Sequence, residues 1–301
     1  MSNSRSAVLR WRNHLFREWT VRSWRSLLPP AATPTPACWS DDELTAAWLG
    51  HSTVLINFFG FNIITDPVLF PRIGIRLPTL TIGPKRLTAP ALNVSELPRV
   101  DLVLLSHAHF DHFDLRTLHR LPRNAAVITA KRTSDLLRGT RFQRVTELSW
   151  NETTALESDR GELLVRAFPV RHWGARLRTD TYRGYNGYVL ERHGHAIIFG
   201  SDSALTDSFA ALRRPRPYDL AIMAIGAYDP WIRSHSTPEE AVQMARAAGA
   251  EHIMPVHHQT FRLSAEPFRE PIERFEAALS REPERIALRG IGETFRLAAS
   301  K

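Results

Sequence analysis

His107-Ala108-His109-Phe110-Asp111-His112 is the stretch that decides how this chain folds. It follows Val100-Asp-Leu-Val-Leu-Leu-Ser106, an apolar run that predicts a buried strand. Three imidazoles and a carboxylate therefore lie at the C-terminal end of a strand, where side chains can converge. Because crowding these groups is costly unless cations bind them, the block predicts a loop that holds a pair of divalent metal ions. The competing interpretation is a polar loop that happens to be rich in histidine.

The composition limits the class of protein. The chain has 301 residues, 43% of them hydrophobic, and no run approaches the ~20 apolar residues of a membrane-spanning helix. Cys38 is the only cysteine, which excludes an internal disulfide and a multi-cysteine metal site. Metal ligands must therefore be mainly histidine and carboxylate, a set that suits zinc, manganese or iron.

The formal net charge of +8 permits several kinds of partner, namely a nucleic acid, an anionic membrane surface or a phosphorylated substrate. No nucleic-acid-binding module is evident in the sequence, so nucleic acid is not the expected partner.

Residues 1–39 differ from the rest of the chain, because they are rich in arginine, contain Glu18 as their only acidic residue and hold half of the tryptophans. Val8, Trp11, Leu15 and Trp19 fall on one helical stripe, which is typical of an interfacial amphipathic helix and equally of a helix packed on the body. The proline-rich residues 29–36 predict a stiff linker. We therefore expect two parts, an arm with its linker at 1–39 and a folded domain that contains the metal loop at 40–301.

Strands and helices are expected to alternate in two similar rounds from residue 44 onward. The first round has strands at 46–51, 52–58, 61–66 and 125–130, with helices at 115–121 and 133–137. The second has strands at 163–170, 187–191, 196–201, 220–225 and 253–256, helices at 237–249 and 271–279, and a last strand at 293–297. Thr237-Pro238-Glu239-Glu240 gives the first of these later helices an N-cap and a capping box. Two such rounds predict a layered α/β sandwich.

Three further polar residues follow predicted strands of the second round. His172 follows Ala167-Phe-Pro-Val-Arg171, Asp202 follows Ile197-Ile-Phe-Gly-Ser201, and His257 follows Ile253-Met-Pro-Val256. Strand ends at one edge of a sandwich can meet in space, so these side chains are expected to join the histidine-rich loop.

The block at 107–112, followed in order by His172, Asp202 and His257, resembles the signature of the metallo-β-lactamase superfamily. The resemblance extends over about residues 48–261 and implies a four-layer αββα sandwich with its metals at one edge. It implies that two divalent ions are bound, Zn²⁺ first and Mn²⁺ or Fe²⁺ as alternatives. One ion would be held by His107, His109 and His172 and the other by Asp111, His112 and His257, with Asp202 bridging them.

Within the superfamily the chain is most similar to the phospholipases D that hydrolyse N-acylphosphatidylethanolamine and to their bacterial relatives. The segments that carry this are Trp48-Leu-Gly-His-Ser-Thr-Val54, Thr65-Asp-Pro67, His172-Trp173, Gly226-Ala-Tyr-Asp-Pro230 and Pro238-Glu-Glu-Ala241. The resemblance implies a phosphodiesterase that cleaves a glycerophospholipid, with a hydroxide shared by the two ions as nucleophile.

The same resemblance implies roles for individual residues. Asp111 and His235 are the expected catalytic residues, with His235 contacting the scissile phosphate or protonating the leaving oxygen. His51 and Asp66 are expected to orient the metal ligands. Departures at Gly200-Ser-Asp-Ser-Ala204 and His258 leave the substrate open. The alternative is a sugar-phosphate lactonase, or another small-molecule hydrolase, on the same centre.

The expected partner is a phospholipid or another phosphodiester substrate, with peripheral membrane association through residues 1–39; a homodimer is also allowed. Since no secretory signal is evident, the expected location is the cytoplasm, at the inner membrane surface if the arm binds lipid.

Overall fold

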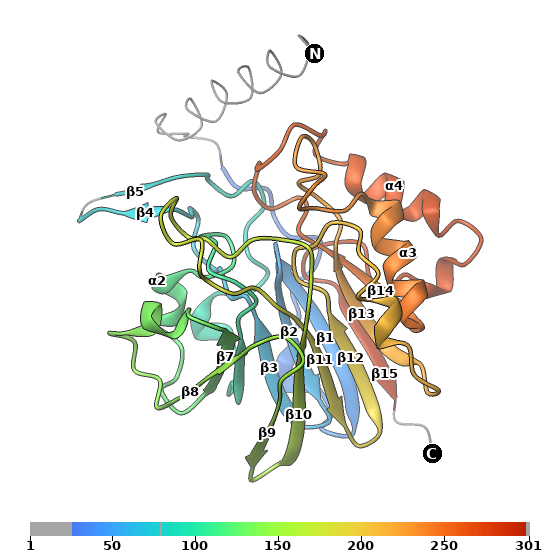
Figure 1. Ribbon diagram of the computed structural model, residues 1–301, viewed down its shortest axis with the longest axis horizontal. Coiled ribbons are helices and arrows are strands. Elements are labelled where there is room, and N and C mark those ends of the chain that lie inside the picture. Colours follow the sequence, from blue (N-terminus) through green and yellow to red (C-terminus); the bar gives the residue numbers. More distant parts are fainter. Residues whose placement is uncertain (1–25, 79, 299–301) are drawn as a thin grey trace.

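Two mixed β-sheets face each other in the computed structural model, which describes residues 26–78 and 80–298 (Figure 1). The seven-stranded sheet has the order β15-β1-β2-β3-β6-β7-β8, and the six-stranded sheet has the order β14-β13-β12-β11-β10-β9. The first sheet comprises β1 (Glu43–Gly50), β2 (Thr53–Phe58), β3 (Phe61–Thr65), β6 (Leu102–Leu104), β7 (Ala126–Ala130), β8 (Arg144–Leu148) and β15 (Thr294–Ala298). The second comprises β9 (Thr153–Ser158), β10 (Gly161–Phe168), β11 (Gly187–Arg192), β12 (His195–Phe199), β13 (Tyr218–Ala224) and β14 (Ala250–Val256).

The remaining elements are one small hairpin and a few helices. The hairpin is β4 (Ile75–Arg76) with β5 (Thr81–Ile82), and the α-helices are α2 (Leu115–Leu118), α3 (Pro238–Ala248) and α4 (Glu270–Ala278). The 3₁₀ turns are η1 (Pro36–Cys38), η2 (Val94–Glu96), η3 (Ser134–Leu137), η4 (Ala210–Leu212) and η5 (Pro283–Arg285).

The outer helical layers are unequal in the described part of the chain. α3 and α4 lie on the outer face of the second sheet, whereas the first sheet is covered mainly by α2, η3 and loops (Figure 1). The predicted αββα sandwich is confirmed, but the helix expected at 115–121 is only four residues long. Pro122 accounts for this, because the residue before a proline is pushed out of the α conformation. The helix expected at 133–137 is the 3₁₀ turn η3.

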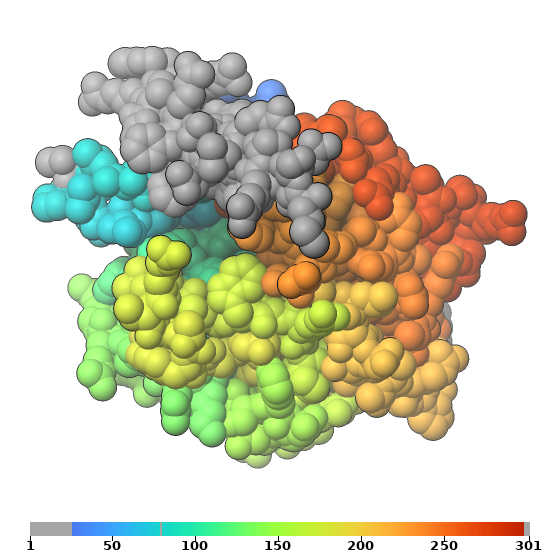
Figure 2. Space-filling model, turned by 45° about the horizontal axis from the view of Figure 1, so that its top comes forward, coloured from blue at the N-terminus to red at the C-terminus, as the bar shows by residue number. Residues whose placement is uncertain are grey.

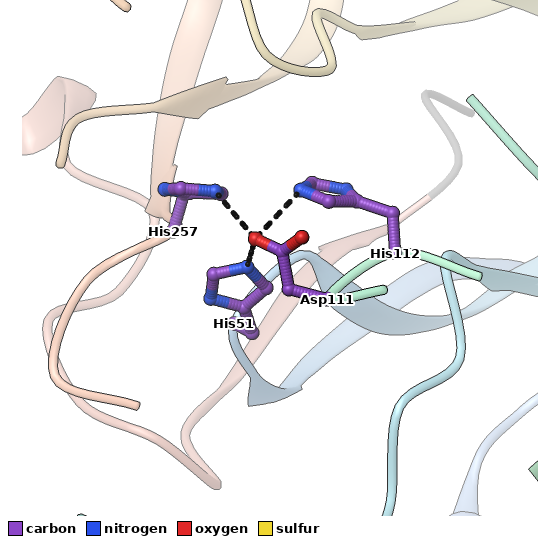
Figure 3. Close-up of side chains that lie close together, drawn as sticks. All are labelled: His51, Asp111, His112 and His257. Carbon is purple, nitrogen blue, oxygen red and sulfur yellow. Dashed lines mark hydrogen bonds and ion pairs between the residues drawn. The ribbon is translucent and has the colours of Figure 1, made fainter. Parts of the chain in front are cut away.

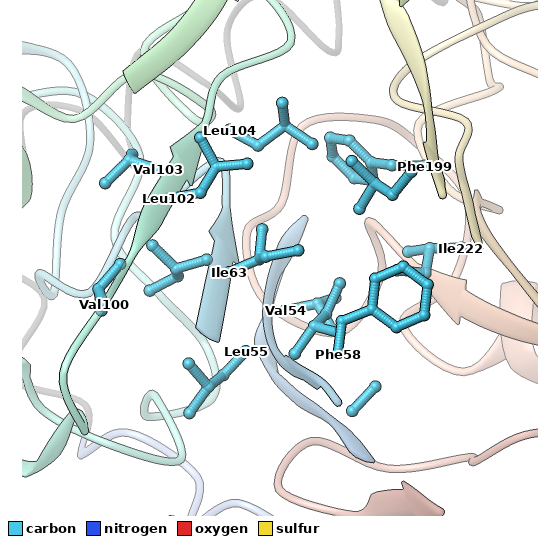
Figure 4. Close-up of a cluster of buried hydrophobic side chains, with 14 of the residues drawn as sticks. Val54, Leu55, Phe58, Ile63, Val100, Leu102, Val103, Leu104, Phe199 and Ile222 are labelled. Atoms are coloured by element: carbon cyan, nitrogen blue, oxygen red, sulfur yellow. The ribbon is translucent and has the colours of Figure 1, made fainter. Parts of the chain in front are cut away.

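Strand alternation divides the apolar side chains between two cores. Ile197 and Phe199 of β12 point between the sheets, where Phe199 meets residues of the first sheet (Figure 4). Ile198 points the other way and packs beneath α3 and α4. The second sheet is therefore buried on both faces, which explains its near-continuous apolar strands.

Two edge strands, β8 and β9, are absent from the sequence prediction. Residues of β9 alternate between exposed and half-buried, and those of β8 are mostly exposed or half-buried. Strands at the rim of a sheet bury little apolar surface, so polar residues suffice there and the hydrophobic pattern is weak.

The described part of the expected linker is bonded to the body. Leu28 N donates to Leu87 O at 2.8 Å, Ala31 N donates to Ile291 O at 2.8 Å, and Trp39 packs against the main core. The amphipathic stripe expected at Val8 to Trp19 lies outside the described residues. Within residues 26–78 and 80–298, no helix is both long enough and apolar enough to cross a membrane.

One edge of the sandwich gathers the C-terminal ends of strands from both sheets. β3 and β6 are parallel, as are β12, β13 and β14, and β10 runs the same way as β12 because both are antiparallel to β11. The segments that leave these strands carry Asp66, His107, His172, Asp202 and His257. The topology therefore brings together side chains that are far apart in the sequence.

Phe275→Ala tests the core beneath the second sheet. Phe275 of α4 is fully buried, so truncation leaves a cavity and should lower the free energy of unfolding by about 3–5 kcal/mol. Urea unfolding measures the change. Phe268→Ala, at a side chain that is 40% exposed, is the control and should change stability far less; equal effects would contradict the described packing of α4.

Candidate metal centre

The first set of converging side chains comprises His107, His109 and His172. His107 Nε2 lies 2.9 Å from His109 Nδ1, which lies 3.3 Å from His172 Nε2. His107 and His109 are two residues apart on the loop that follows β6, and His172 comes from the segment after β10. Three imidazole nitrogens directed at one point form a typical three-histidine metal-binding arrangement.

The second set lies beside the first and comprises Asp111, His112 and His257, joined by His51 (Figure 3). Asp111 Oδ2 is 3.6 Å from His112 Nε2, 3.6 Å from His257 Nε2 and 2.9 Å from His51 Nε2. His51 was expected to orient ligands, and its ring holds the Asp111 carboxylate directly. His257 enters from the end of β14 and His112 from the loop after β6.

Asp202 lies between the two sets. Its Oδ2 atom is 3.0 Å from His112 Nε2 and 3.1 Å from His257 Nε2, and it is 4.0 Å from His107 Nε2 and 3.9 Å from His172 Nε2. One carboxylate oxygen thus faces imidazoles of both sets. The structure brings all seven predicted ligands together; their role as ligands remains a prediction.

The buried carboxylate of Asp66 orients two of these histidines. Asp66 Oδ2 accepts from His112 Nδ1 at 2.7 Å and from Ser106 Oγ at 2.6 Å, while Oδ1 accepts from Ser106 N at 2.7 Å. Ser106 Oγ in turn lies 2.8 Å from His107 Nδ1. With both Nδ1 atoms engaged, the Nε2 atoms of His107 and His112 are left to face the centre.

Further contacts fix the other ligands and their loop. His172 Nδ1 donates to Ser234 O at 2.9 Å, which leaves Nε2 for the centre. Arg176 Nη1 donates to the carbonyls of Ala108 and Phe113, both at 2.9 Å, and so clamps the two ends of the histidine-rich loop.

Burial and crowding set the protonation of the histidines. Burial, with repulsion from neighbouring imidazoles, holds the pKa of His107 well below its ordinary value and lowers the pKa of His109 to about 3. Burial also lowers the pKa of His172 to about 4 and holds that of His235 well below its usual range. These four imidazoles are neutral at physiological pH and can offer lone pairs.

Two histidines behave in the opposite way. Burial alone would lower their pKa, but the charge of Asp202 with contacts to Asp111 raises the pKa of His257 to about 9 and that of His112 well above its ordinary value. Burial would raise the pKa of Asp111 and Asp202, yet the facing imidazolium charges hold both well below their usual range. Without a metal ion, the raised pKa values of His112 and His257 favour the protonated form of both imidazoles.

The donor set fits divalent metal ions. Among the described residues, several buried atoms of this site have no hydrogen-bond partner, including His112 Nε2, His257 Nε2, Asp202 Oδ1 and His235 Nδ1. Buried polar atoms without a partner are rare, and metal coordination would satisfy them. Nitrogen and carboxylate ligands suit zinc and similar ions.

Several residues at this edge have left-handed backbone conformations. The φ angle is +55° at His51, +34° at Asp66, +55° at Ser201 and +64° at His257. L-residues seldom adopt such conformations, and each costs about 1–3 kcal/mol. The sharp turns at strand ends direct these side chains, or that of the adjacent Asp202, into the centre.

A pocket of about 180 Å³ opens onto both sets of ligands. His109, Asp111, Asp202 and His257 lie at its polar part, and its other lining residues are Trp173, Ala227, Trp231, His235 and Leu263. His235 Nδ1 is 3.9 Å from Asp202 Oδ2, so His235 faces the centre as expected. His172, Asp202 and His235 also form a group whose ligand atoms lie within 4.8 Å of one another.

Sequence reasoning did not identify several residues of this site. Ser106 and Arg176 act through hydrogen bonds that no local pattern reveals, and Leu263 reaches the pocket from a loop after β14. Arg86 is 2% exposed and donates to Val68 O and Thr88 O. His258 is not at the centre and instead packs on the Trp48 ring, with centroids 4.5 Å apart.

Comparisons with known proteins agree with this geometry. The family model described as "Beta-lactamase superfamily domain" matches residues 62–258. An uncharacterized protein of Mycobacterium tuberculosis is 34% identical over 268 residues, which cover 86% of this chain and 70% of that protein. A protein of Caenorhabditis elegans named N-acyl-phosphatidylethanolamine-hydrolyzing phospholipase D 1 is 30% identical over 247 residues, covering 77% of this chain and 68% of the relative.

A solved structure gives the same fold. Igni18, described as a metallo hydrolase from the archaeon Ignicoccus hospitalis, superposes with a TM-score of 0.64 at 19% identity. The match covers 86% of this chain and all of that one. At this identity the likeness establishes the architecture alone.

Asp66→Asn tests the orienting carboxylate. An amide has one acceptor oxygen where the carboxylate uses two, so it cannot accept from Ser106 N, Ser106 Oγ and His112 Nδ1 together, and the affinity for Zn²⁺ should fall about 10–100-fold. Competition with a chromophoric chelator measures it. Asp219→Asn is a matched control, because Asp219 is also buried and bonds a histidine, His195, at 2.9 Å but lies at the start of β13. Equal losses in the two variants would contradict the role of Asp66.

Metal uptake should release protons. A ligand must be deprotonated to bind, and His257, with a pKa of about 9, and His112 carry protons in the metal-free protein at neutral pH. The affinity for Zn²⁺ should therefore increase as the pH rises toward about 9, the pKa of His257, and decrease as the pH is lowered. Calorimetric titration with Zn²⁺ in buffers of different ionisation enthalpy measures the released protons; heats that do not depend on the buffer would contradict the assignment.

Proposed function

Because the chain belongs to the beta-lactamase superfamily and is a metal-dependent hydrolase, we propose that it cleaves the phosphodiester of a glycerophospholipid, as a phospholipase D does. The observation that carries this proposal is the pocket over the two sets of ligands, whose base is polar and whose walls hold two indole rings.

The pocket suits an amphiphilic, negatively charged substrate. Trp173 and Trp231 are 42% and 36% exposed, so their rings offer apolar surface at the opening. No lysine or arginine is among the described residues that line it. The negative charge of a phosphodiester would then be met at the base of the pocket, while its apolar parts contact the walls.

The metal ligands would be His107, His109, His112, His172, Asp111, Asp202 and His257. When bound, a pair of divalent ions lowers the pKa of a shared water and neutralises charge that develops on the phosphate. Asp111 lines the pocket with its carboxylate fixed by His51, and so it would orient the attacking water. The low pKa of Asp111 keeps this group ionised and able to accept a hydrogen bond.

His235 would act on the substrate. Its backbone N donates to Trp231 O at 3.0 Å, which fixes the loop just before α3, and its ring meets that of His172 with centroids 5.0 Å apart. A buried neutral imidazole can donate one hydrogen bond, and we assign that bond to a phosphoryl oxygen or to the leaving oxygen.

The relatives support the lipid substrate. The C. elegans protein is named for hydrolysis of N-acyl-phosphatidylethanolamine, and this chain covers 68% of it. We extend the proposal to zinc as the metal and to a cytoplasmic protein that reaches its substrate at the inner membrane surface. The basic residues 1–39 would contribute to this association.

His235→Ala tests the role of the histidine. With N-acylphosphatidylethanolamine in mixed micelles, kcat should fall about 10²–10⁴-fold because the hydrogen bond to the reacting phosphate is lost. Metal content, measured by elemental analysis, should stay unchanged. His195→Ala is the control, since His195 is buried but bonds Asp219.

The outcomes separate three interpretations. Hydrolysis in isotopically labelled water should place the label in phosphatidic acid, as attack at phosphorus requires. Loss of bound metal in His235→Ala would show that His235 is a ligand. Turnover of a sugar-phosphate lactone with none of any phosphodiester would contradict the proposal and favour the small-molecule hydrolase.

A further inference from the structure

The β4–β5 hairpin carries its apolar side chains on its solvent-exposed face, whereas strands packed on a protein usually turn such side chains toward the core. Ile75 pairs with Ile82 and Arg76 with Thr81, and Leu77 N donates to Leu80 O at 2.7 Å. The pairing places four aliphatic side chains on one face, and each is well exposed: Ile75 53%, Leu77 41%, Leu80 51% and Ile82 38%.

The opposite face of the hairpin is directed at the body. Thr81 Oγ1 accepts from Arg116 Nη1 at 3.0 Å, and Arg116 belongs to α2. Thr81 on the polar side therefore bonds the body, and the aliphatic stripe faces away from it. In Figures 1 and 2 the hairpin, coloured cyan, projects from the left side of the body.

Two glycines create this reversal. Ile73 is buried against Val68 and Phe261, and regular alternation would bury Ile75 as well. Gly74, with φ +119°, interrupts the alternation, and a Cβ there would lie 2.1 Å from Ile82 O. Gly83 stands opposite with φ +149°, and its Cβ would lie 2.2 Å from Ile73 O. The base of the hairpin is thus closely packed, and this packing fixes the aliphatic stripe in its outward orientation.

The hairpin is continuous with the wall of the metal pocket. The small cluster that anchors it, Val68, Ile73 and Phe261, has Leu263 packed against it. Leu263 also lines the pocket. The chain enters the body at Leu28, which pairs with Thr88 just after the hairpin. The stripe, the pocket and the entry of the basic arm therefore lie on neighbouring segments.

The charged side chains of the hairpin and its flanking segments are all of one sign. No aspartate or glutamate occurs between Asp66 and Glu96, whereas Arg72, Arg76 and Lys85 flank the stripe. Arg76 is exposed, and Arg72 holds the hairpin by donating to Gly83 O. Aliphatic side chains surrounded by cations suit a surface that is apolar within and anionic outside.

We propose that the β4–β5 hairpin inserts its aliphatic stripe into an anionic phospholipid bilayer and so seats the metal pocket at the membrane surface. This proposal rests on the proposed function only for the identity of the substrate, because the evidence for membrane insertion comes from the geometry of the hairpin. Four half-exposed side chains are far less than the ~800 Å² per partner of a stable dimer, which disfavours a second copy as occupant.

The experiment uses the full metal-loaded chain and vesicles of phosphatidylcholine with phosphatidylglycerol. Leu77→Gln/Leu80→Gln should lower the vesicle partition coefficient about tenfold or more, because two apolar side chains no longer leave water. Val145→Gln, at a side chain that is 38% exposed on β8, is the matched control and should bind as the parent does. Turnover of a water-soluble phosphodiester should be equal in all three proteins.

A second measurement reports insertion directly. A polarity-sensitive fluorophore on Leu77→Cys, in a Cys38→Ser background, should shift to the blue on addition of these vesicles, and the same label on Val145→Cys should not. Equal binding by Leu77→Gln/Leu80→Gln and its parent, no shift at position 77, or a changed oligomeric state in that variant would overturn the proposal. Absence of any phosphodiester turnover in the parent would instead contradict the proposed function, and the vesicle result would stand.

Discussion

The arrangement of the candidate site depends on one buried carboxylate. Asp66 has no access to solvent, and burial raises its pKa even though Ser106 and His112 bond to it. A carboxylate in such a place is unfavourable unless its oxygens are fully used. Here it receives three hydrogen bonds and, through Ser106, also sets the ring of His107. These hydrogen bonds offset the free-energy cost of burying the acid, and they also fix the orientation of two imidazoles.

The surrounding scaffold supports this arrangement with long-range bonds. His51 N donates to Thr260 Oγ1 at 2.6 Å, and His51 O accepts from His257 N at 3.0 Å. These bonds join the turn between β1 and β2 to the end of β14, so the two sheets are tied at the edge where the ligands meet. A rigid junction there keeps both sets of ligands in register.

Much of the candidate site could be predicted from sequence because its residues stand directly after apolar strands. The spacing of the block His107 to His112 was enough to identify it as a metal-binding loop. Asp202 and His257 were assigned as ligands because they follow in the order in which the ligands occur in the family that the chain resembles. Arg176 could not be found this way, because it acts through carbonyls 63 and 68 residues away. The edge strands β8 and β9 were missed because they bury too little apolar surface to show a clear hydrophobic pattern. The β4–β5 hairpin was missed because Gly74 and Gly83 interrupt the alternation of its side chains between the two faces.

The left-handed turns at His51, Asp66, Ser201 and His257 have a consequence for the living cell. A backbone held in such conformations raises the energy of the folded state, and ions that bind only the folded state would offset this cost. The folded fraction of newly made chains would then follow the supply of metal. We expect proteolytic turnover to remove chains made under metal starvation, so that abundance, and not only activity, reports on metal nutrition.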